Sequence, residues 1–319
     1  MAIRVELAPF RPYWMRLRMR MRVRTKWSVS AIAAGVIFST QAPAAPPGEA
    51  CHNAALPIPR TAPGSMGGQE FARRVGDLEG SARDAEVGRA LLAGNLPEHL
   101  RHLTAVTLEG RGRDGAPLTV TFCVMPDYLA VGSDSDSLIV PMGLPTALNV
   151  AAEFDSVLPT PRLVDAIYEA ANLKLAPQPL PASGEMRSTA YLVRHDTLIA
   201  EQRALRAAPG DALTAGHKKD LVLSDRLLDL PGRVAIYGWH WAAQHPIQPL
   251  STVHGAQYAD YSHGVRLVSR IIYVNGAARE FFDALRDPAL TLLLGGDGAR
   301  LGRQLHGDLV SVLQQRNPK

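Results

Sequence analysis

The stretch STVHGAQYADYSHGVRLVSR, residues 251–270, concentrates side chains that can carry acid–base or nucleophilic chemistry. Six of the ten histidines of the chain lie between residues 195 and 263. They are His195, His217, His240, His245, His254 and His263. Several stand beside glycines or at the ends of short strand-like runs, where a rigid scaffold presents a side chain to a ligand. The clustering predicts that at least two of these histidines share a functional site.

Acid–base catalysis needs a histidine with a pKa near neutrality and a carboxylate that orients it. Asp260 or Asp220 is a candidate for the orienting carboxylate, and Tyr258 or Tyr261 is a candidate hydrogen-bond donor to a leaving group or oxyanion. A covalent route would use Ser262 as the nucleophile. Because neighbouring residues of a strand point to opposite faces, Ser262 cannot pair with His263 and would need His240 or His254 as its base.

A metal site is the third possibility, since His240, His254, Asp260 and His263 could supply ligands. The sequence contains no HExxH, HxH or CxxC motif, so we predict neither a metal nor another cofactor. The turn GSDSDS, residues 132–137, offers Asp134 and Asp136 to calcium, although its composition is more typical of a polar turn. The predicted catalytic residues are therefore His240, His254, His263, Asp260, Ser262 and Tyr258.

A second group of residues has the character of a substrate-binding surface. Lys218 and Lys219 lie in an alternating run, so one should face the histidines and the other should point away. The run is either a solvated strand edge or, with Arg266, a clamp for a carboxylate or phosphate. Aromatic side chains surround the stretch and suit sugars or peptide stems. The predicted substrate-binding residues are Lys218, Lys219, Arg266, Tyr261 and Trp239.

The words YGWH and SHGVRLV resemble the signature of the L,D-transpeptidases, over about 30 residues. In that family an HG pair precedes an SHGC element, and an arginine follows the nucleophilic cysteine by two residues. The family reworks peptidoglycan cross-links outside the cytoplasm, so the resemblance implies a cell-wall substrate and a base role for His263. This chain departs from the signature because Val265 occupies the cysteine position, Arg266 comes one residue early, and His254-Gly255 lies closer to SHG than usual.

The chain also resembles a broad set of exported bacterial proteins that share the blocks LPT…VDAIY and PIQPLS…DYSHG. That resemblance implies export but no particular activity.

Residues 1–45 have the pattern of a secretory signal peptide: a basic segment, an apolar run of about a dozen residues and a small-residue end. This segment carries eight positive charges and one negative, so the remaining chain has a net charge near −3 instead of +4. The basic isoelectric point therefore belongs to the targeting segment and does not indicate nucleic-acid binding. We expect a periplasmic or secreted protein with no stable membrane anchor after cleavage. Met21 is an alternative start to Met1.

The remaining chain should fold as one globular domain, residues 67–319, after an extended, Pro-rich lead-in at residues 46–66. Residues 67–103 have helical periodicity and form a possible helical subdomain. A hairpin is predicted around Asp114-Gly115, and short strands follow residue 210. Helices and strands do not alternate strictly, which favours an α+β fold in which a mixed or antiparallel sheet carries the histidines.

Cys51 and Cys123 are the only cysteines, and in an exported protein we expect them to form a disulfide; a nucleophilic Cys123 is the alternative. Together these observations predict an exported hydrolase acting on a cell-wall or other extracellular polymer. The alternative is a non-catalytic binding protein for cell-wall fragments or anionic saccharides.

Overall fold

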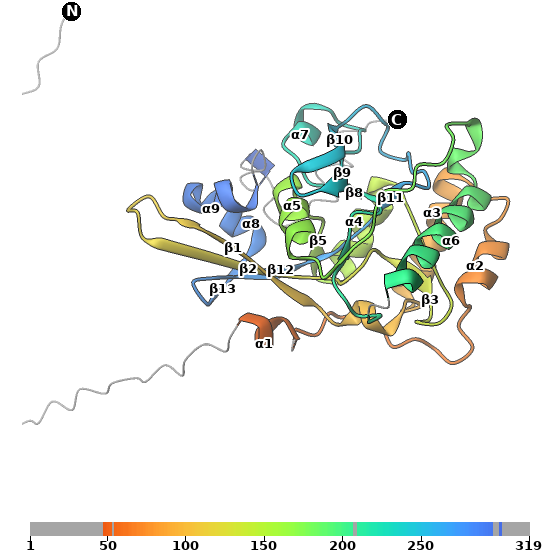
Figure 1. The fold of residues 1–319 in the computed structure, drawn as a ribbon, viewed down its shortest axis with the longest axis horizontal. Helices are drawn as coiled ribbons and strands as arrows, with labels where there is room; N and C mark the ends of the chain where they lie inside the picture. The colour runs from red at the N-terminus through yellow and green to blue at the C-terminus, as the bar shows by residue number, and fades with distance from the viewer. Residues whose placement is uncertain (1–46, 53, 207–208, 296–299, 302–319) are drawn as a thin grey trace, which may run out of the picture. The chain divides into compact units, whose positions relative to one another are not determined.

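In the computed structural model, residues 47–52, 54–206, 209–295 and 300–301 are described, and the predicted signal peptide lies outside them. All described residues belong to one compact unit, Pro43–Lys319. Helices and mostly antiparallel sheets make up this unit, which confirms the predicted α+β class (Figure 1). No helix in the described part of the chain is long and apolar enough to cross a membrane.

The larger sheet has strand order β1-β2-β12-β13, with β5 also paired to β12. Its strands are β1 (Thr104–Arg111), β2 (Pro117–Val124), β5 (Ser156–Val157), β12 (Val268–Val274) and β13 (Ala277–Glu280). β1 and β2 form the predicted hairpin, and Gly115 in its turn has a φ of 80°. Strand β12, which comes late in the sequence, lies in the middle of this sheet and pairs with β2, which comes early.

The smaller, four-stranded sheet carries the histidine-rich stretches and is mixed, as predicted. Its order is β10 (His245–Ser251), β9 (Ile236–Ala242), β8 (Lys219–Leu221) and β11 (His263–Gly264), with only β8 and β11 parallel. Two further pairs are β3 (Ala130–Gly132) with β4 (Ser137–Ile139), and β6 (Leu173–Lys174) with β7 (Thr214–Ala215).

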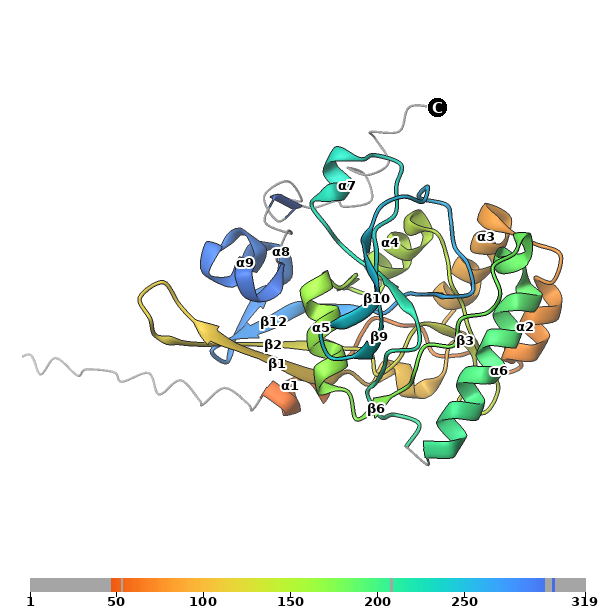
Figure 2. The same cartoon turned by 45° about the horizontal axis from the view of Figure 1, so that its top comes forward.

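Helices flank both sheets. They are α2 (Gly68–Arg74), α3 (Gly80–Leu92), α4 (Leu144–Glu153), α5 (Pro161–Ala170), α6 (Thr189–Arg206), α7 (Arg226–Asp229), α8 (Phe281–Arg286) and α9 (Pro288–Leu294), with short 3₁₀ turns η1 (Glu98–Arg101) and η2 (Gly184–Arg187). In both views α2, α3 and α6 gather at one end, while α8 and α9 lie beside β1 and β2 at the other (Figure 2). Phe71, Val87 and Leu91 of α2 and α3 belong to the main hydrophobic core, so these helices share it.

Local sequence explains where α5 begins. Thr160 caps the helix by accepting a hydrogen bond from Leu163 N, and Pro161 occupies the first helical position, where a missing N–H costs nothing. The apolar residues at helical spacing, among them Leu163 and Ile167, are buried in the core. The helix therefore holds Asp165, on its other face, in a fixed place.

The expectation of an extended lead-in is wrong for its first residues, because Pro47–His52 form a short helix, α1. The predicted disulfide joins Cys51 on α1 to Cys123 on β2, with 5.2 Å between their Cα atoms. Both cysteines are buried, so Cys123 is not a free nucleophile. This bond ties a segment of small and polar residues to the larger sheet.

Candidate active site

Strand β8 separates the predicted site residues into two groups. In its pairing with β11, Lys219 lies opposite His263 and Asp220 lies opposite Gly264. Because side chains alternate along a strand, Lys219 and His263 share one face, which we call the histidine face. Asp220 and Lys218 belong to the opposite, inner face. Only glycine fits at position 264, since a Cβ there would lie 2.5 Å from a ring carbon of Tyr128.

Asp260 is the centre of the histidine face. Its Oδ1 accepts hydrogen bonds from the backbone N–H of Ser262 (2.8 Å) and from the Ser262 hydroxyl (2.6 Å). Its Oδ2 accepts one from the Tyr258 hydroxyl (3.0 Å) and lies 3.9 Å from Nε2 of His263. Asp260, Ser262 and His263 are buried, whereas Tyr258 is partly exposed. The structure thus brings together four of the six predicted catalytic residues.

The protonation states of this group follow from burial and charge. Burial lowers the pKa of His263 to about 4, with Asp260 acting in the opposite direction. Burial also works against the charge of Asp260, but His263, the Ser262 hydrogen bonds and Lys219 outweigh it and lower the pKa of this carboxyl. Near pH 7 Asp260 is therefore a carboxylate and His263 a neutral imidazole. Neither ring nitrogen of His263 has a hydrogen-bond partner in the described part of the chain.

His254, the fifth member, stacks on Tyr258 at the outer side of this group. The two ring centroids are 4.0 Å apart and the planes differ by only 7°. The His254 ring lies 6.3 Å from that of His263, and both stacked rings are partly exposed. The guanidinium of Arg187 lies 5.9 Å above the Tyr258 ring. The stacked pair therefore forms the partly exposed, outer side of this group.

His240 does not join this group. Its Nε2 lies 3.0 Å from Oδ1 of Asp165 on α5, the oxygen that also accepts from the Tyr237 hydroxyl. The prediction that three histidines line one site is wrong for His240. The backbone explains the difference, because Gly238 and Trp239 have φ values of 107° and 59° and interrupt the regular alternation just before it.

Lys218 and Arg266 lie on the inner face and are almost completely buried, which corrects their prediction as a surface clamp. Nζ of Lys218 donates to Tyr261 O (2.7 Å) and lies 3.0 Å from Nδ1 of His195. The guanidinium of Arg266 donates to backbone carbonyls, including Met125 O at 2.9 Å, and these bonds tie the sheets together. Both cations already have protein acceptors.

The two aromatic residues of the predicted binding group also lie largely inside. The Tyr261 hydroxyl accepts from Leu180 N (2.7 Å) and donates to Leu180 O (3.1 Å), which fixes the Pro-rich segment before α6. Trp239 is 5% exposed, and Nζ of Lys219 lies 4.9 Å from its ring. Of the predicted binding residues, Lys219 is the one whose side chain lies on the histidine face, and its ammonium group has no hydrogen-bond or ion-pair partner among the described residues.

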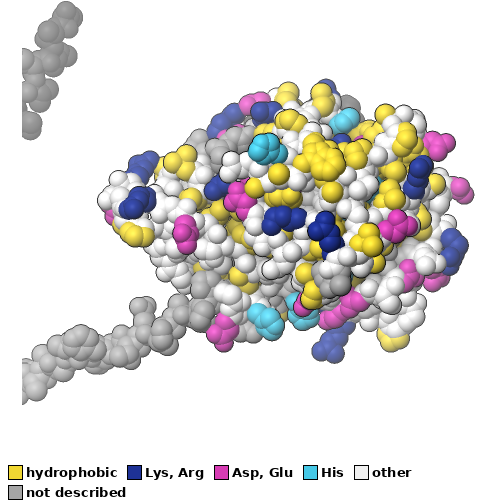
Figure 3. Space-filling view, viewed as in Figure 1, with side chains coloured by type: hydrophobic (Ala, Val, Ile, Leu, Met, Phe, Trp, Pro, Cys, Tyr) yellow, Lys and Arg dark blue, Asp and Glu magenta, His cyan; other side chains and the backbone are white. Residues whose placement is uncertain are grey.

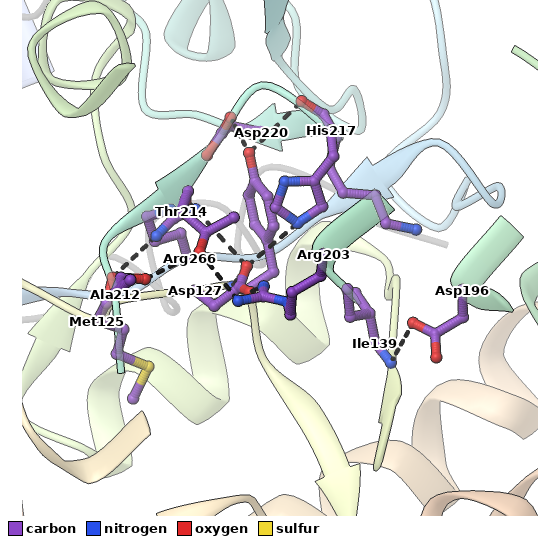
Figure 4. Close-up of polar contacts among 12 residues, drawn as sticks. Met125, Asp127, Ile139, Asp196, Arg203, Ala212, Thr214, His217, Asp220 and Arg266 are labelled. Carbon is purple, nitrogen blue, oxygen red and sulfur yellow. Dashed lines mark hydrogen bonds and ion pairs between the residues drawn. The ribbon is translucent and has the colours of Figure 1, made fainter. Parts of the chain in front are cut away.

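Sequence reasoning missed a buried charged network on the inner side. Asp127 lies between Arg203, Arg266 and His217 (Figure 4). Burial opposes ionisation of Asp127, but His217 and the two arginines hold its pKa below the usual range, and burial lowers the pKa of His217. Asp127 follows the end of β2 directly after a proline, a weak signal that does not identify its partners.

The network borders a hollow of about 710 Å³ between α2, α6 and the β3–β4 turn. Asp134 in that turn binds His99, and Asp136 accepts from Gln69 N, as in a polar turn. No group of three or more metal-ligating residues with suitable geometry occurs among the residues that the structure describes.

Comparison of the chain with protein-family models, with curated proteins and with solved structures finds no match. Function must therefore be inferred from the residues and contacts of the site itself.

Proposed function

We propose that the protein is an exported hydrolase that acts on a cell-wall or other extracellular polymer through Asp260 and His263. The observation that supports this most is the neutral imidazole of His263, with two unpaired ring nitrogens beside an ionised carboxylate. Buried polar atoms are rarely left without partners, since each costs about 1–3 kcal/mol. A substrate or a reacting water would supply the missing partner.

In the proposed reaction the imidazole of His263 takes a proton from water as the water oxygen attacks the substrate. The carboxylate of Asp260 then stabilises the imidazolium that forms. Their 3.9 Å separation is longer than a hydrogen bond, as is common before a substrate is bound. In this proposal His254, which is partly exposed at the outer side, would give a proton to the leaving group.

The geometry favours direct attack by water over a covalent serine route. The Ser262 hydroxyl is buried and donates to Asp260, an anion, so no histidine of the described segments activates it. We therefore assign Ser262 to holding Asp260 in place. The disulfide and the predicted signal peptide support export, since such bonds persist in oxidising compartments.

A second candidate is a binding protein for cell-wall fragments or anionic saccharides that uses the same face without turnover. The complete burial of His263 favours it, because a general base must reach the proton it removes. The partly exposed His254–Tyr258 stack offers a flat surface to a sugar ring without any chemistry.

Digestion of purified peptidoglycan by the purified protein, read by mass spectrometry with and without a chelator, separates the two. We expect cleavage products whose formation rises with pH through the pKa of His263, because the base must be neutral. His263→Ala should lower the rate at least 100-fold, a typical general-base effect. His245→Ala, at an exposed position on β10, is the matched control and should leave it unchanged.

Binding to the polymer without any products would favour the binding protein instead. If the protein neither cleaves nor binds peptidoglycan, both candidate functions are refuted for the cell wall.

A further inference from the structure

Lys219 differs from the two other lysines that the structure describes. Nζ of Lys174 donates to two backbone carbonyls, Ala171 O at 2.8 Å and Glu169 O at 3.2 Å. Nζ of Lys218 has two partners on the inner face. Nζ of Lys219 makes no hydrogen bond or ion pair with any described residue, and it lies 4.9 Å from the centroid of the Trp239 ring.

No carboxylate among the described residues pairs with Nζ of Lys219, and the surroundings of the side chain explain why. Asp260 attracts its charge, yet both oxygens of Asp260 already accept hydrogen bonds from Ser262 and Tyr258. The side chain is partly buried, and burial lowers the pKa of Lys219 below its ordinary value, against the attraction of Asp260. An ammonium group that has lost part of its hydration shell and has gained no hydrogen-bond acceptor from the protein favours the binding of an anion.

We propose that Lys219 binds the carboxylate of an acidic saccharide, whose sugar ring lies against the His254–Tyr258 stack. This inference rests on the proposed function, because it names the class of polymer that the same face receives. Lys219 and His263 lie opposite each other on neighbouring strands, so a carboxylate held by Lys219 places the adjoining sugar near the proposed base.

The surface around Lys219 suits a saccharide better than an extended peptide. Hydrophobic side chains gather over β9 and β10, with Lys and Arg side chains nearby, and Trp241 of β9 is 57% exposed (Figure 3). Sugar rings pack on such aromatic faces. A peptide that adds to a sheet edge needs free N–H donors, but Pro246 and Pro249 remove two of them from the edge strand β10.

Binding of two matched oligomers tests the inference independently of turnover. The probes are an α-1,4-linked galacturonic acid trimer and the neutral galactose trimer of the same linkage, titrated into the full protein by calorimetry. We expect the acidic trimer to bind at least tenfold more tightly, and added salt to reduce the difference. Lys219→Met should abolish the preference, whereas Lys219→Arg should retain most of it.

Lys174→Met is the matched control, because Lys174 also lies over an aromatic ring, 5.6 Å from that of Tyr168, but has its own acceptors. This variant should bind both trimers as the wild type does. Equal binding of the two trimers, no binding of either, or an acid preference that survives in Lys219→Met would each overturn the inference. Cleavage of a neutral polymer, with no preference for the acidic trimer, would overturn the role of Lys219 but leave the proposed hydrolase activity intact. Selective binding of the acidic trimer without any cleavage would support the role of Lys219 and refute the hydrolase activity.

Discussion

Removal of the disulfide is expected to cost a large part of the stability of the protein. Cys51 and Cys123 are 72 residues apart in sequence, and both are buried. A cross-link that closes a loop of this length lowers the entropy of the unfolded chain by an amount worth about 4 kcal/mol at 25 °C. Replacement of both cysteines by alanine should therefore destabilise the fold by about 3–4 kcal/mol.

Urea unfolding followed by tryptophan fluorescence measures this effect. With a slope of about 3 kcal/mol per molar urea, the midpoint of the double variant should fall by about 1 M. Wild-type protein treated with a reductant should unfold at nearly the same midpoint as the double variant, since both lack the same covalent constraint.

A double variant that unfolds within about 0.2 M urea of the oxidised wild type, with an unchanged slope, would contradict this prediction. That result would mean that the bond adds nothing to the constraints already present in the unfolded chain. A steeper slope at an unchanged midpoint would instead show that the unfolded state of the double variant is more expanded. The free energy of unfolding in water would then differ from that of the wild type.

Two further predictions concern buried charges. Burial raises the pKa of Asp84, on α3, to about 6 from the ordinary 3.8, so the folded state binds its proton more tightly and loses stability as pH rises from about 4 to about 6. Relative to that of the wild type, the free energy of unfolding of Asp84→Asn should therefore rise by about 2 kcal/mol between pH 4 and pH 7, as measured by urea unfolding. An equal difference between the two proteins at both pH values would contradict this prediction. Arg266→Met removes a buried cation that binds Met125 O and lies 3.9 Å from Asp127, and should cost about 3–5 kcal/mol in thermal unfolding. An unchanged melting temperature would show that Arg266 is dispensable to the fold.

Local patterns in the sequence predicted several elements correctly. The alternating runs on either side of Asp114-Gly115 form the hairpin, and the helical periodicity of residues 67–103 forms α2 and α3. These elements depend on neighbouring residues alone, which is why the sequence suffices to predict them. The disulfide followed from the small number of cysteines and the expected compartment.

The residues that contact the site residues could not be predicted from the sequence. Alternation along β8 placed Lys218 and Lys219 on opposite faces, but which face is inner depends on the layer that packs against it. His240 pairs with Asp165, 75 positions earlier and on a helix, because two positive φ values before it redirect the strand. Contacts of this kind depend on tertiary packing, which no local pattern encodes.

The place of β12 in the larger sheet has a consequence for the order in which the chain folds. Synthesis delivers the β1–β2 hairpin and both cysteines early, but β12, which pairs with β2 and β5, comes only after most of the domain has been made. Long-range pairing of this kind is slow compared with local folding. Until β12 pairs with β2, one edge of the sheet is open, and an open strand edge favours self-association.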